Sequence, residues 1–172
     1  MELEQAIRSR RTHKAFRPDP VAADVLDELF ELAGWAPNHH LTNPWRFRVI
    51  GERALRLLSA AADEAKPGSA RKLERAPTLV AVTAAQTGDP AQDREDLLAT
   101  GVAVYVVMLA AHGRGLASYW RTLPVLDTPV GRAALGIPQD EVAVGLLHLG
   151  RALHAPEPPP RAPVASCVVH LD

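Results

Sequence analysis

The chain has 172 residues, of which 47% are hydrophobic and 23% charged, which suits one domain with a packed core. The net charge of −1 excludes a general attraction to nucleic acid or to an anionic membrane. A single cysteine, Cys167, excludes an intramolecular disulfide and fits a reducing compartment. The first residues are acidic and amphipathic, without the pattern of a secretory signal, so we expect a cytoplasmic location.

Hydrophobic periodicity and turn residues predict alternating helices and strands in the first half of the chain. The elements that we expect there are helices at 2–10, 24–35, 52–66 and 69–75, and strands at 45–49 and 78–84. A polar loop at 38–43 leads through Pro44 into the first strand, where aromatic and apolar residues alternate with arginines.

The run at 95–116 is the segment around which we expect the fold to be organised. Acids near its start suit the positive end of a helix dipole, and Gly113 and Gly115 suit its end. A helix with almost no polar face is expected to be buried on all sides. The run is shorter than the roughly 20 apolar residues of a membrane span. We therefore interpret it as a core helix, covered by the rest of the chain or by a second subunit.

The last third of the chain ends in an unusual way. Strands at 117–120 and 143–149 and a helix at 129–135 are expected first. A stiff, proline-rich segment at 155–163 then carries a last apolar strand at 164–171. A strand on such an arm suits addition to the sheet edge of a partner, so both this arm and the apolar helix predict a dimer.

Two groups of polar residues in the first half could bind a ligand. Arg10, Arg11 and Thr12 at a helix end could hold a phosphate through charge-assisted hydrogen bonds, or could simply complement the helix dipole. His39 and Asn43 lie on a loop before a strand, where binding groups are common, although a plain surface loop fits equally well. Two adjacent histidines without a nearby cysteine or carboxylate match no common metal spacing, so we expect no metal.

A third group follows the long apolar helix. Trp120, Arg121 and Thr122 combine an aromatic plane, a cation and a hydroxyl at a strand end, although a core tryptophan beside a snorkelling arginine is the alternative. Cys167 lies in an apolar segment and is expected to be chemically inert. The sequence lacks the nucleophile elbow, the P-loop and the dinucleotide-binding glycine motif, which argues against the corresponding enzyme classes.

Together these segments resemble the nitroreductase family of FMN enzymes, in its short single-domain branch. The matching stretches appear in family order and are RSRRTHKAF (8–16), APNHHLTNPWRFRVI (36–50), AAHGRGLASYWRT (110–122) and LGIPQDEVAVGLLHLG (135–150). The resemblance implies an α+β fold with a mostly antiparallel sheet flanked by helices, in which residues 1–172 form one FMN-binding domain. It also implies an intertwined homodimer with exchange of the C-terminal strand and two FMN sites at the interface.

The resemblance further implies a set of cofactor-binding residues from three segments: Arg10, Arg11 and Thr12; His39 and Asn43; and Trp120, Arg121 and Thr122. The first and third groups would hold the phosphate end of FMN, and the second, from the other subunit, would approach the flavin. The stretch at 110–115 matches a segment associated with the nicotinamide cofactor. Two departures are Thr12, where the family usually has serine, and Lys14, where arginine is common.

The expected activity is that of an FMN oxidoreductase. It would take hydride from NAD(P)H and reduce a nitroaromatic, a quinone or a similar small acceptor in one pocket by a ping-pong mechanism. Because the flavin carries the chemistry, we expect no catalytic side chain. Two alternatives stay open: another flavin role on the same scaffold, such as dehydrogenation or flavin breakdown, and a non-enzymatic dimeric flavin-binding module.

Overall fold

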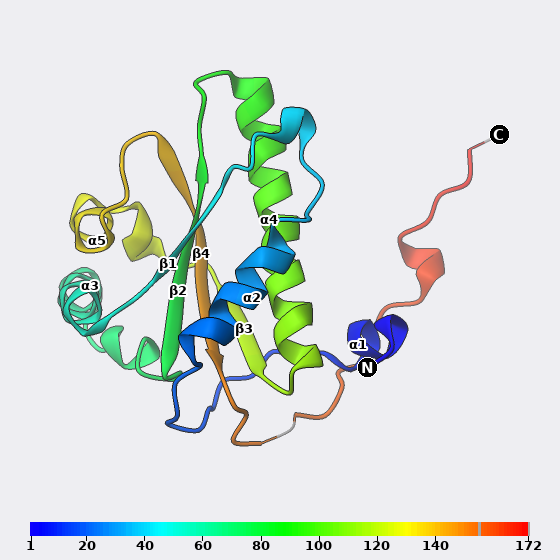
Figure 1. Ribbon diagram of the computed structural model, residues 1–172, viewed down its shortest axis with the longest axis horizontal. Helices are drawn as coiled ribbons and strands as arrows, with labels where there is room; N and C mark the ends of the chain where they lie inside the picture. Colours follow the sequence, from blue (N-terminus) through cyan, green and yellow to red (C-terminus); the bar gives the residue numbers. More distant parts are fainter. Residues whose placement is uncertain (155, 172) are drawn as a thin grey trace.

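The computed structural model describes residues 1–154 and 156–171, and a four-stranded sheet runs through its middle (Figure 1). The strands are β1 (Trp45–Val49), β2 (Thr78–Ala85), β3 (Ala117–Arg121) and β4 (Glu141–Gly150). Their order is β1-β2-β4-β3 and every pairing is antiparallel. The α-helices are α1 (Leu3–Ser9), α2 (Ala23–Ala33), α3 (Glu52–Ala65), α4 (Pro90–Gly113) and α5 (Pro129–Leu135). The short 3-10 helices are η1 (His39–Leu41), η2 (Ala70–Lys72), η3 (Pro124–Asp127) and η4 (Val164–Ser166).

Helices cover both faces of the sheet, because its central strand β2 is apolar on both sides. Val80 and Val82 face α2 and α4, whereas Leu79 and Ala81 face α3 and η3. All four side chains are buried, as alternate residues of a strand point to opposite faces. The predicted α+β fold with a mostly antiparallel sheet flanked by helices is therefore confirmed. The helix predicted at 69–75 is reduced to the single turn η2.

The long helix α4 begins at Pro90, five residues before the predicted start, and has 24 residues. Asp89 is its N-cap, and its carboxylate accepts the backbone N–H two residues further on at 2.8 Å. The helix ends at Gly113, just before Gly115 with φ 74°. The cap was missed because it lies outside the apolar run on which the prediction was based.

The helix α4 has one buried face and one uncovered face. Eight of its residues are buried, and five of these pack in the hydrophobic core with α2 and the sheet. Leu98, Val102 and Tyr105 form a stripe on the other side and are 64%, 41% and 38% exposed, so the single chain does not cover the helix on all sides and cover by a second subunit stays a prediction. By length and composition α4 could cross a membrane, contrary to our expectation. Core helices meet the same test, and the buried face of α4 packs as a core helix does.

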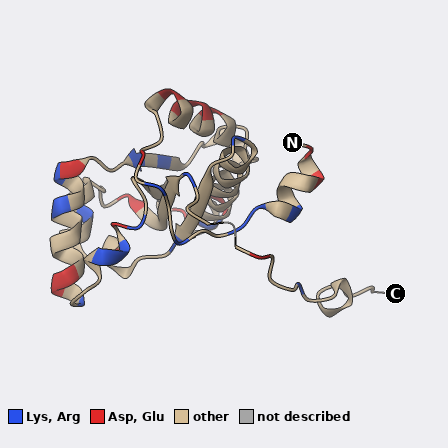
Figure 2. Ribbon diagram, turned by 90° about the horizontal axis from the view of Figure 1, so that it is seen from below, with Lys and Arg blue, Asp and Glu red and all other residues tan. Residues whose placement is uncertain are grey.

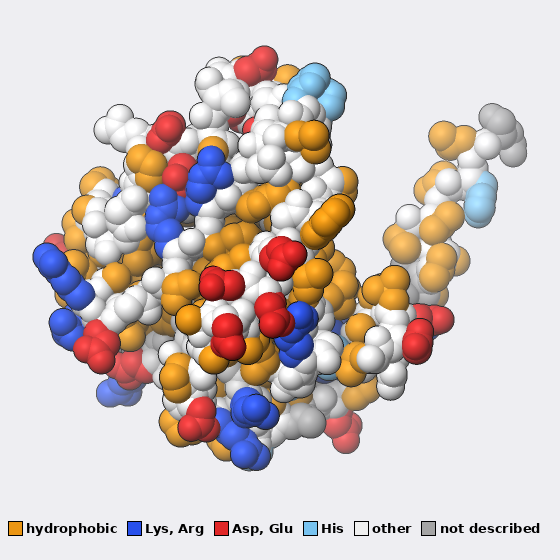
Figure 3. Space-filling model, in the orientation of Figure 1, with side chains coloured by type: hydrophobic (Ala, Val, Ile, Leu, Met, Phe, Trp, Pro, Cys, Tyr) orange, Lys and Arg blue, Asp and Glu red, His pale blue; other side chains and the backbone are white. Residues whose placement is uncertain are grey.

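The C-terminal segment points away from the rest of the chain (Figures 1 and 3). The strand predicted at 164–171 is wrong for the single chain, where one 3-10 turn is followed by irregular backbone. Val164, Val169 and Leu171 are 73%, 81% and 90% exposed. A strand needs a neighbour for its backbone hydrogen bonds, and this arm has none among the residues that the structure describes. The exchange of this segment between subunits stays a prediction.

Candidate functional site

The first predicted group lies where α1 ends and the chain meets the edge of the sheet. Thr12 forms a parallel bridge with Ser118 of β3, and the backbone N–H of His13 donates to the Ser118 carbonyl at 3.1 Å. Basic residues mark the end of α1 and the segment that follows it (Figure 2). These backbone contacts hold Arg10 and Arg11 beside the edge strand.

The two arginines carry buried donors that lack acceptors. Arg10 Nε and Nη1 and Arg11 Nε are buried and have no hydrogen-bond partner among the described residues. Arg11 Nη1 donates to the carbonyls of Arg8 and Arg10 at 2.6 and 2.8 Å, which fixes its guanidinium in place. Burial of an unpaired charged donor is unfavourable. This cluster therefore suits an anion, and a phosphate group matches a guanidinium in geometry as well as in charge.

Two histidines complete this cluster, and sequence reasoning missed both. His112 near the end of α4 has its Nε2 atom 2.7 Å from Ser9 Oγ. Burial lowers the pKa of His112, and the neighbouring charges of Arg10, His13 and Arg11 lower it further. Burial and the charge of Arg10 likewise lower the pKa of His13. Both lie within stretches that we had matched, His13 in 8–16 and His112 in 110–122, but no pattern in the sequence places His112 beside Arg10.

The third predicted group lies at the end of β3, and its members point in different directions. Trp120 is part of the core between the sheet and α4, and its Nε1 donates to the Val144 carbonyl at 3.2 Å. The Arg121 side chain points to the other face of the sheet, as does that of His148. Burial lowers the pKa of His148, and the charge of Arg121 lowers it further. Arg121 Nη1 is buried without a partner among the described residues. Thr122 follows the strand and is exposed.

The loop that carries the second predicted group has a strained backbone. His40, Leu41 and Asn43 have φ values of 55°, 52° and 45°, in the left-handed region that disfavours most side chains. Such residues cost on the order of 1–3 kcal/mol each and concentrate at functional sites. Asn38 stabilises the turn, because its Oδ1 accepts the backbone N–H of Asn43 at 2.9 Å.

Adjacent carboxylates of α4 hold this loop. His39 Nδ1 lies 2.6 Å from Glu95 Oε2, and the Thr42 hydroxyl donates to Asp96 Oδ1 at 2.6 Å. Asp96 is only 2% exposed and also accepts from the Gln92 amide at 3.0 Å. Beside the loop lies a cavity of about 390 Å³, bordered by Pro37, Asn38, His39, Glu95, Leu98, Ala99 and Val102.

Within one chain, the arginine cluster and the loop lie near opposite ends of α4 (Figure 1). The loop contacts α4 at Glu95, and α1 contacts it at His112, 17 residues further along. At about 1.5 Å per residue, these contacts are roughly 25 Å apart. The structure therefore brings Arg10, Arg11 and Thr12 together, but it does not bring His39 and Asn43 to them.

The comparison with known proteins decides the family. The sequence profile described as the nitroreductase family matches residues 7–151. The chain belongs to the nitroreductase family. The resemblance that we drew from the sequence is thereby confirmed.

Two solved structures and one curated protein illustrate the similarity within the nitroreductase family. The chain is 26% identical to YfhC of Bacillus subtilis, named as a candidate NAD(P)H nitroreductase, over 94% of this chain and 90% of that protein. A nitroreductase-like protein from Bacillus cereus superposes with a TM-score of 0.90 at 26% identity, over 100% of this chain and 97% of that one. The FMN-dependent nitroreductase NfnB from Mycobacterium smegmatis, solved with NADPH, gives 0.77 at 20% identity, over 98% and 97% of the two chains, and shares the fold.

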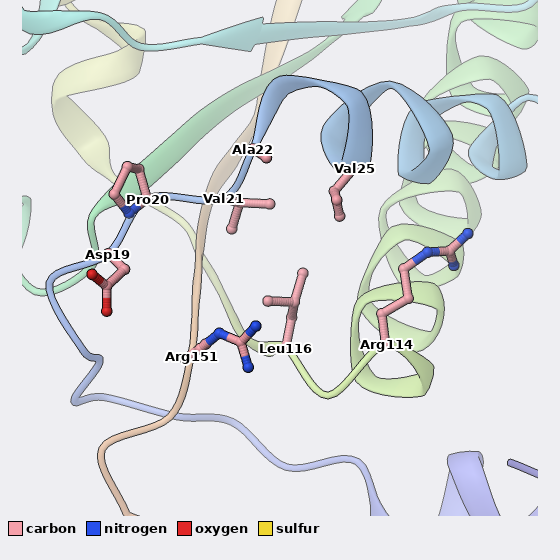
Figure 4. A pocket seen from close by; sticks show the side chains of 8 residues that line it. All are labelled: Asp19, Pro20, Val21, Ala22, Val25, Arg114, Leu116 and Arg151. Carbon is pink, nitrogen blue, oxygen red and sulfur yellow. The ribbon is translucent and has the colours of Figure 1, made fainter.

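This nitroreductase-family chain has another cavity, of about 290 Å³, where α2 begins and α4 ends (Figure 4). Its lining residues are Asp19, Pro20, Val21, Ala22, Val25, Arg114, Leu116 and Arg151. Arg114 is held by Glu28, whose Oε2 accepts from Nε at 3.1 Å and from Nη2 at 2.9 Å. Arg114 belongs to the stretch at 110–115 that we matched to nicotinamide binding, and its side chain lines this cavity.

Proposed function

We propose that this chain is an FMN-dependent oxidoreductase, which takes hydride from NAD(P)H and reduces nitroaromatics, quinones or similar small acceptors. The observation that carries this proposal is the buried, unpartnered guanidinium nitrogens of Arg10 and Arg11. A phosphate monoester would supply the missing acceptors. Membership of the nitroreductase family and the FMN dependence of the M. smegmatis relative support the choice of FMN as the phosphate-bearing molecule.

The residues of this chain would bind and orient the cofactor. Arg10 and Arg11 would donate to the phosphate, the Thr12 hydroxyl would add a further donor, and Arg121 would offer a third cation from the edge strand. Trp120 would support this end of the site from the core, and Thr122 would lie beside it. When bound, FMN supplies the hydride transfer, so these side chains need only position it.

The second half of the site would come from a second copy of the chain. The loop with His39 and Asn43 lies roughly 25 Å from the arginine cluster along α4, so one chain alone cannot enclose the cofactor. The uncovered stripe of Leu98, Val102 and Tyr105 offers a surface on which two α4 helices could pack. Antiparallel packing would bring each loop toward the arginines of the other chain. The exposed arm at 164–171 would then exchange between subunits.

The electron donor and the acceptor would bind in turn at the same exposed face of the flavin, which implies ping-pong kinetics. We expect the enzyme to act in the reducing cytoplasm, where the exposed thiol of Cys167 stays free. Flavin-dependent dehydrogenation, flavin breakdown and binding without turnover are the competing roles for the same site.

Anaerobic titration tests this proposal. Purified protein is loaded with FMN and mixed with NADH or NADPH, and the flavin absorbance is followed before and after addition of menadione or a nitroaromatic. We expect bleaching by the nicotinamide and recovery with the acceptor, with parallel double-reciprocal plots in the steady state. Bound FMN that resists both nicotinamides would contradict the reductase activity and favour the competing roles. Absence of FMN binding would contradict the flavin site altogether.

A further inference from the structure

We propose that Glu95 is a positioning residue for His39: it fixes the ring proton on Nδ1 and so leaves Nε2 as a hydrogen-bond acceptor for an N–H group on the flavin ring. The inference rests on the proposed function and adds a residue of α4 to it. It concerns the orientation of His39 and assigns no proton transfer to either residue.

The short contact between the two side chains determines which ring nitrogen carries the proton. His39 Nδ1 and Glu95 Oε2 lie 2.6 Å apart. A carboxylate only accepts hydrogen bonds, so the imidazole must donate from Nδ1. In the neutral ring the other nitrogen, Nε2, is then an acceptor. No partner binds Nε2 among the residues that the structure describes.

Several contacts orient the His39 ring before a ligand binds, although its side chain is 60% exposed and that of Glu95 is 50% exposed. The ring of His39 stacks on that of His40, with centroids 3.8 Å apart and planes 20° from parallel. One residue along α4 from Glu95, the buried Asp96 holds Thr42 of the same loop. Two successive carboxylates of one rigid helix therefore fix the loop at two points, which is how a supporting contact keeps a binding residue in place.

The cavity beside His39 suits a flat ring with one polar edge. Leu98 and Val102 provide an apolar wall, and Asn38, His39 and Glu95 provide the polar side. The ring system of a flavin is planar and carries an N–H on its pyrimidine edge between two carbonyls. An acceptor nitrogen from His39 matches that N–H, whereas a donor nitrogen would leave it unpaired. The tautomer that Glu95 selects is therefore the one that the ring needs.

The first test reads the tautomer directly in the flavin-free, full-length protein. Imidazole ¹⁵N NMR should show His39 protonated on Nδ1 in the wild type. In Glu95→Ala it should shift toward the Nε2–H form, which is the form that free imidazole side chains prefer in water. Glu95→Gln keeps an acceptor oxygen and should retain much of the Nδ1–H form. An unchanged tautomer in Glu95→Ala would overturn the proposal.

The second test uses FMN and riboflavin, which share the ring but differ in the phosphate. Glu95→Ala should weaken the binding of both by a similar factor, roughly three- to tenfold. The matched control is Glu52→Ala, which removes an exposed carboxylate that lies 3.7 Å from Arg56 on the surface of α3 and should change neither affinity. Affinities within twofold of the wild type in Glu95→Ala, or a loss confined to FMN, would overturn the contact with the ring.

The two tests also separate this inference from the proposed function. If the wild type binds neither flavin, the proposed function fails and the ring contact fails with it, although the NMR result still reports the bond between Glu95 and His39. If the wild type binds both flavins and Glu95→Ala binds them equally well, the proposed function stands and this inference fails. Circular dichroism of each variant checks that the fold is intact.

Discussion

The guanidinium of Arg48 on β1 binds the carboxylate of Glu141 on β4 through two hydrogen bonds of 2.8 and 2.9 Å. The pair reaches across β2, where the hydroxyl of Thr83 donates to the same carboxylate. The Glu141 side chain is 9% exposed and that of Arg48 24%, so this is a largely buried ion pair that joins three strands of the sheet.

Glu141→Gln should therefore destabilise the protein by about 3 kcal/mol, the lower end of the range for breaking a buried pair, since Arg48 stays partly hydrated. Urea unfolding of the wild type and the variant measures this loss. Glu52→Gln is the control, because that exposed carboxylate lies 3.7 Å from Arg56 on the surface of α3 and should matter little. A change below about 0.5 kcal/mol for Glu141→Gln would show that the attraction between the two charges does not exceed the cost of removing them from water.

The pair also makes stability depend on acid pH. Burial alone would raise the pKa of Glu141, but the hydrogen bonds and charge of Arg48 and the Thr83 hydroxyl outweigh it, so the pKa is lowered from 4.5. A carboxyl with a lowered pKa in the folded state stabilises the protein above its unfolded pKa. The stability is lost as the pH falls through the folded pKa. In urea unfolding, the difference between the wild type and Glu141→Gln should therefore shrink below pH 4.5. A constant difference would contradict this.

The arginine cluster predicts a second pH effect near neutrality. The pKa of His112 and that of His13 are lowered from 6.5 by burial and neighbouring cations. Below pH 6.5 the unfolded chain therefore binds more protons than the folded one, and the flavin-free protein loses stability as the pH falls. His112→Gln should flatten this dependence in urea unfolding between pH 7.5 and 5.5, whereas His170→Gln on the exposed arm should not. Equal slopes for the wild type and His112→Gln would contradict the role of this histidine.

The sequence predicted the strands of the sheet well, but it predicted the start of α4 and the conformation of the C-terminal segment less well. The strands are short apolar or alternating runs between turn residues, so β2 at Thr78–Ala85 differs from its prediction by one residue. The true start of α4 depends on Asp89, which no hydrophobic pattern reveals. The segment at 164–171 has the composition of a strand, but a strand also needs an edge to pair with.

The limits of sequence reasoning at the site have a similar cause. Arg10 and Arg11 could be proposed because they are adjacent in the chain and match a family motif. The position of His112 near them depends on how α1 packs on α4, where Ser9 contacts a histidine 103 residues further along the chain. The bond between His39 and Glu95 likewise joins residues that are 56 positions apart. Such tertiary pairs leave no spacing that a single sequence displays.

Arg11→Ala should weaken FMN binding by roughly tenfold or more, because a charged partner of the phosphate is lost. Riboflavin, which lacks the phosphate, should bind the variant as it binds the wild type. Arg56→Ala on the surface of α3 is the control for loss of a cation elsewhere. Fluorescence titration of the flavin-free wild type and of the two variants gives their affinities for FMN and riboflavin. An unchanged affinity of Arg11→Ala for FMN, with the fold intact, would remove Arg11 from the site.

The uncovered stripe on α4 predicts that the chain is a homodimer. Val102→Asp places a charge in the middle of that stripe and should convert the dimer to monomer at micromolar concentration. Val130→Asp on α5 changes a side chain of similar exposure on the other side of the sheet and should leave the dimer intact. Sedimentation equilibrium distinguishes the two, and a stable wild-type monomer would contradict the dimer.

The most direct test of the shared site is a hybrid dimer of one Arg11→Ala chain and one His39→Ala chain, isolated with two different affinity tags. If each site takes its arginines from one chain and its loop from the other, one of the two sites in the hybrid carries both changes and the other carries none. FMN titration should then show half of the sites with wild-type affinity, whereas neither parent homodimer has any. A hybrid in which no site regains wild-type affinity would mean that each site is built within one chain, and would contradict the account.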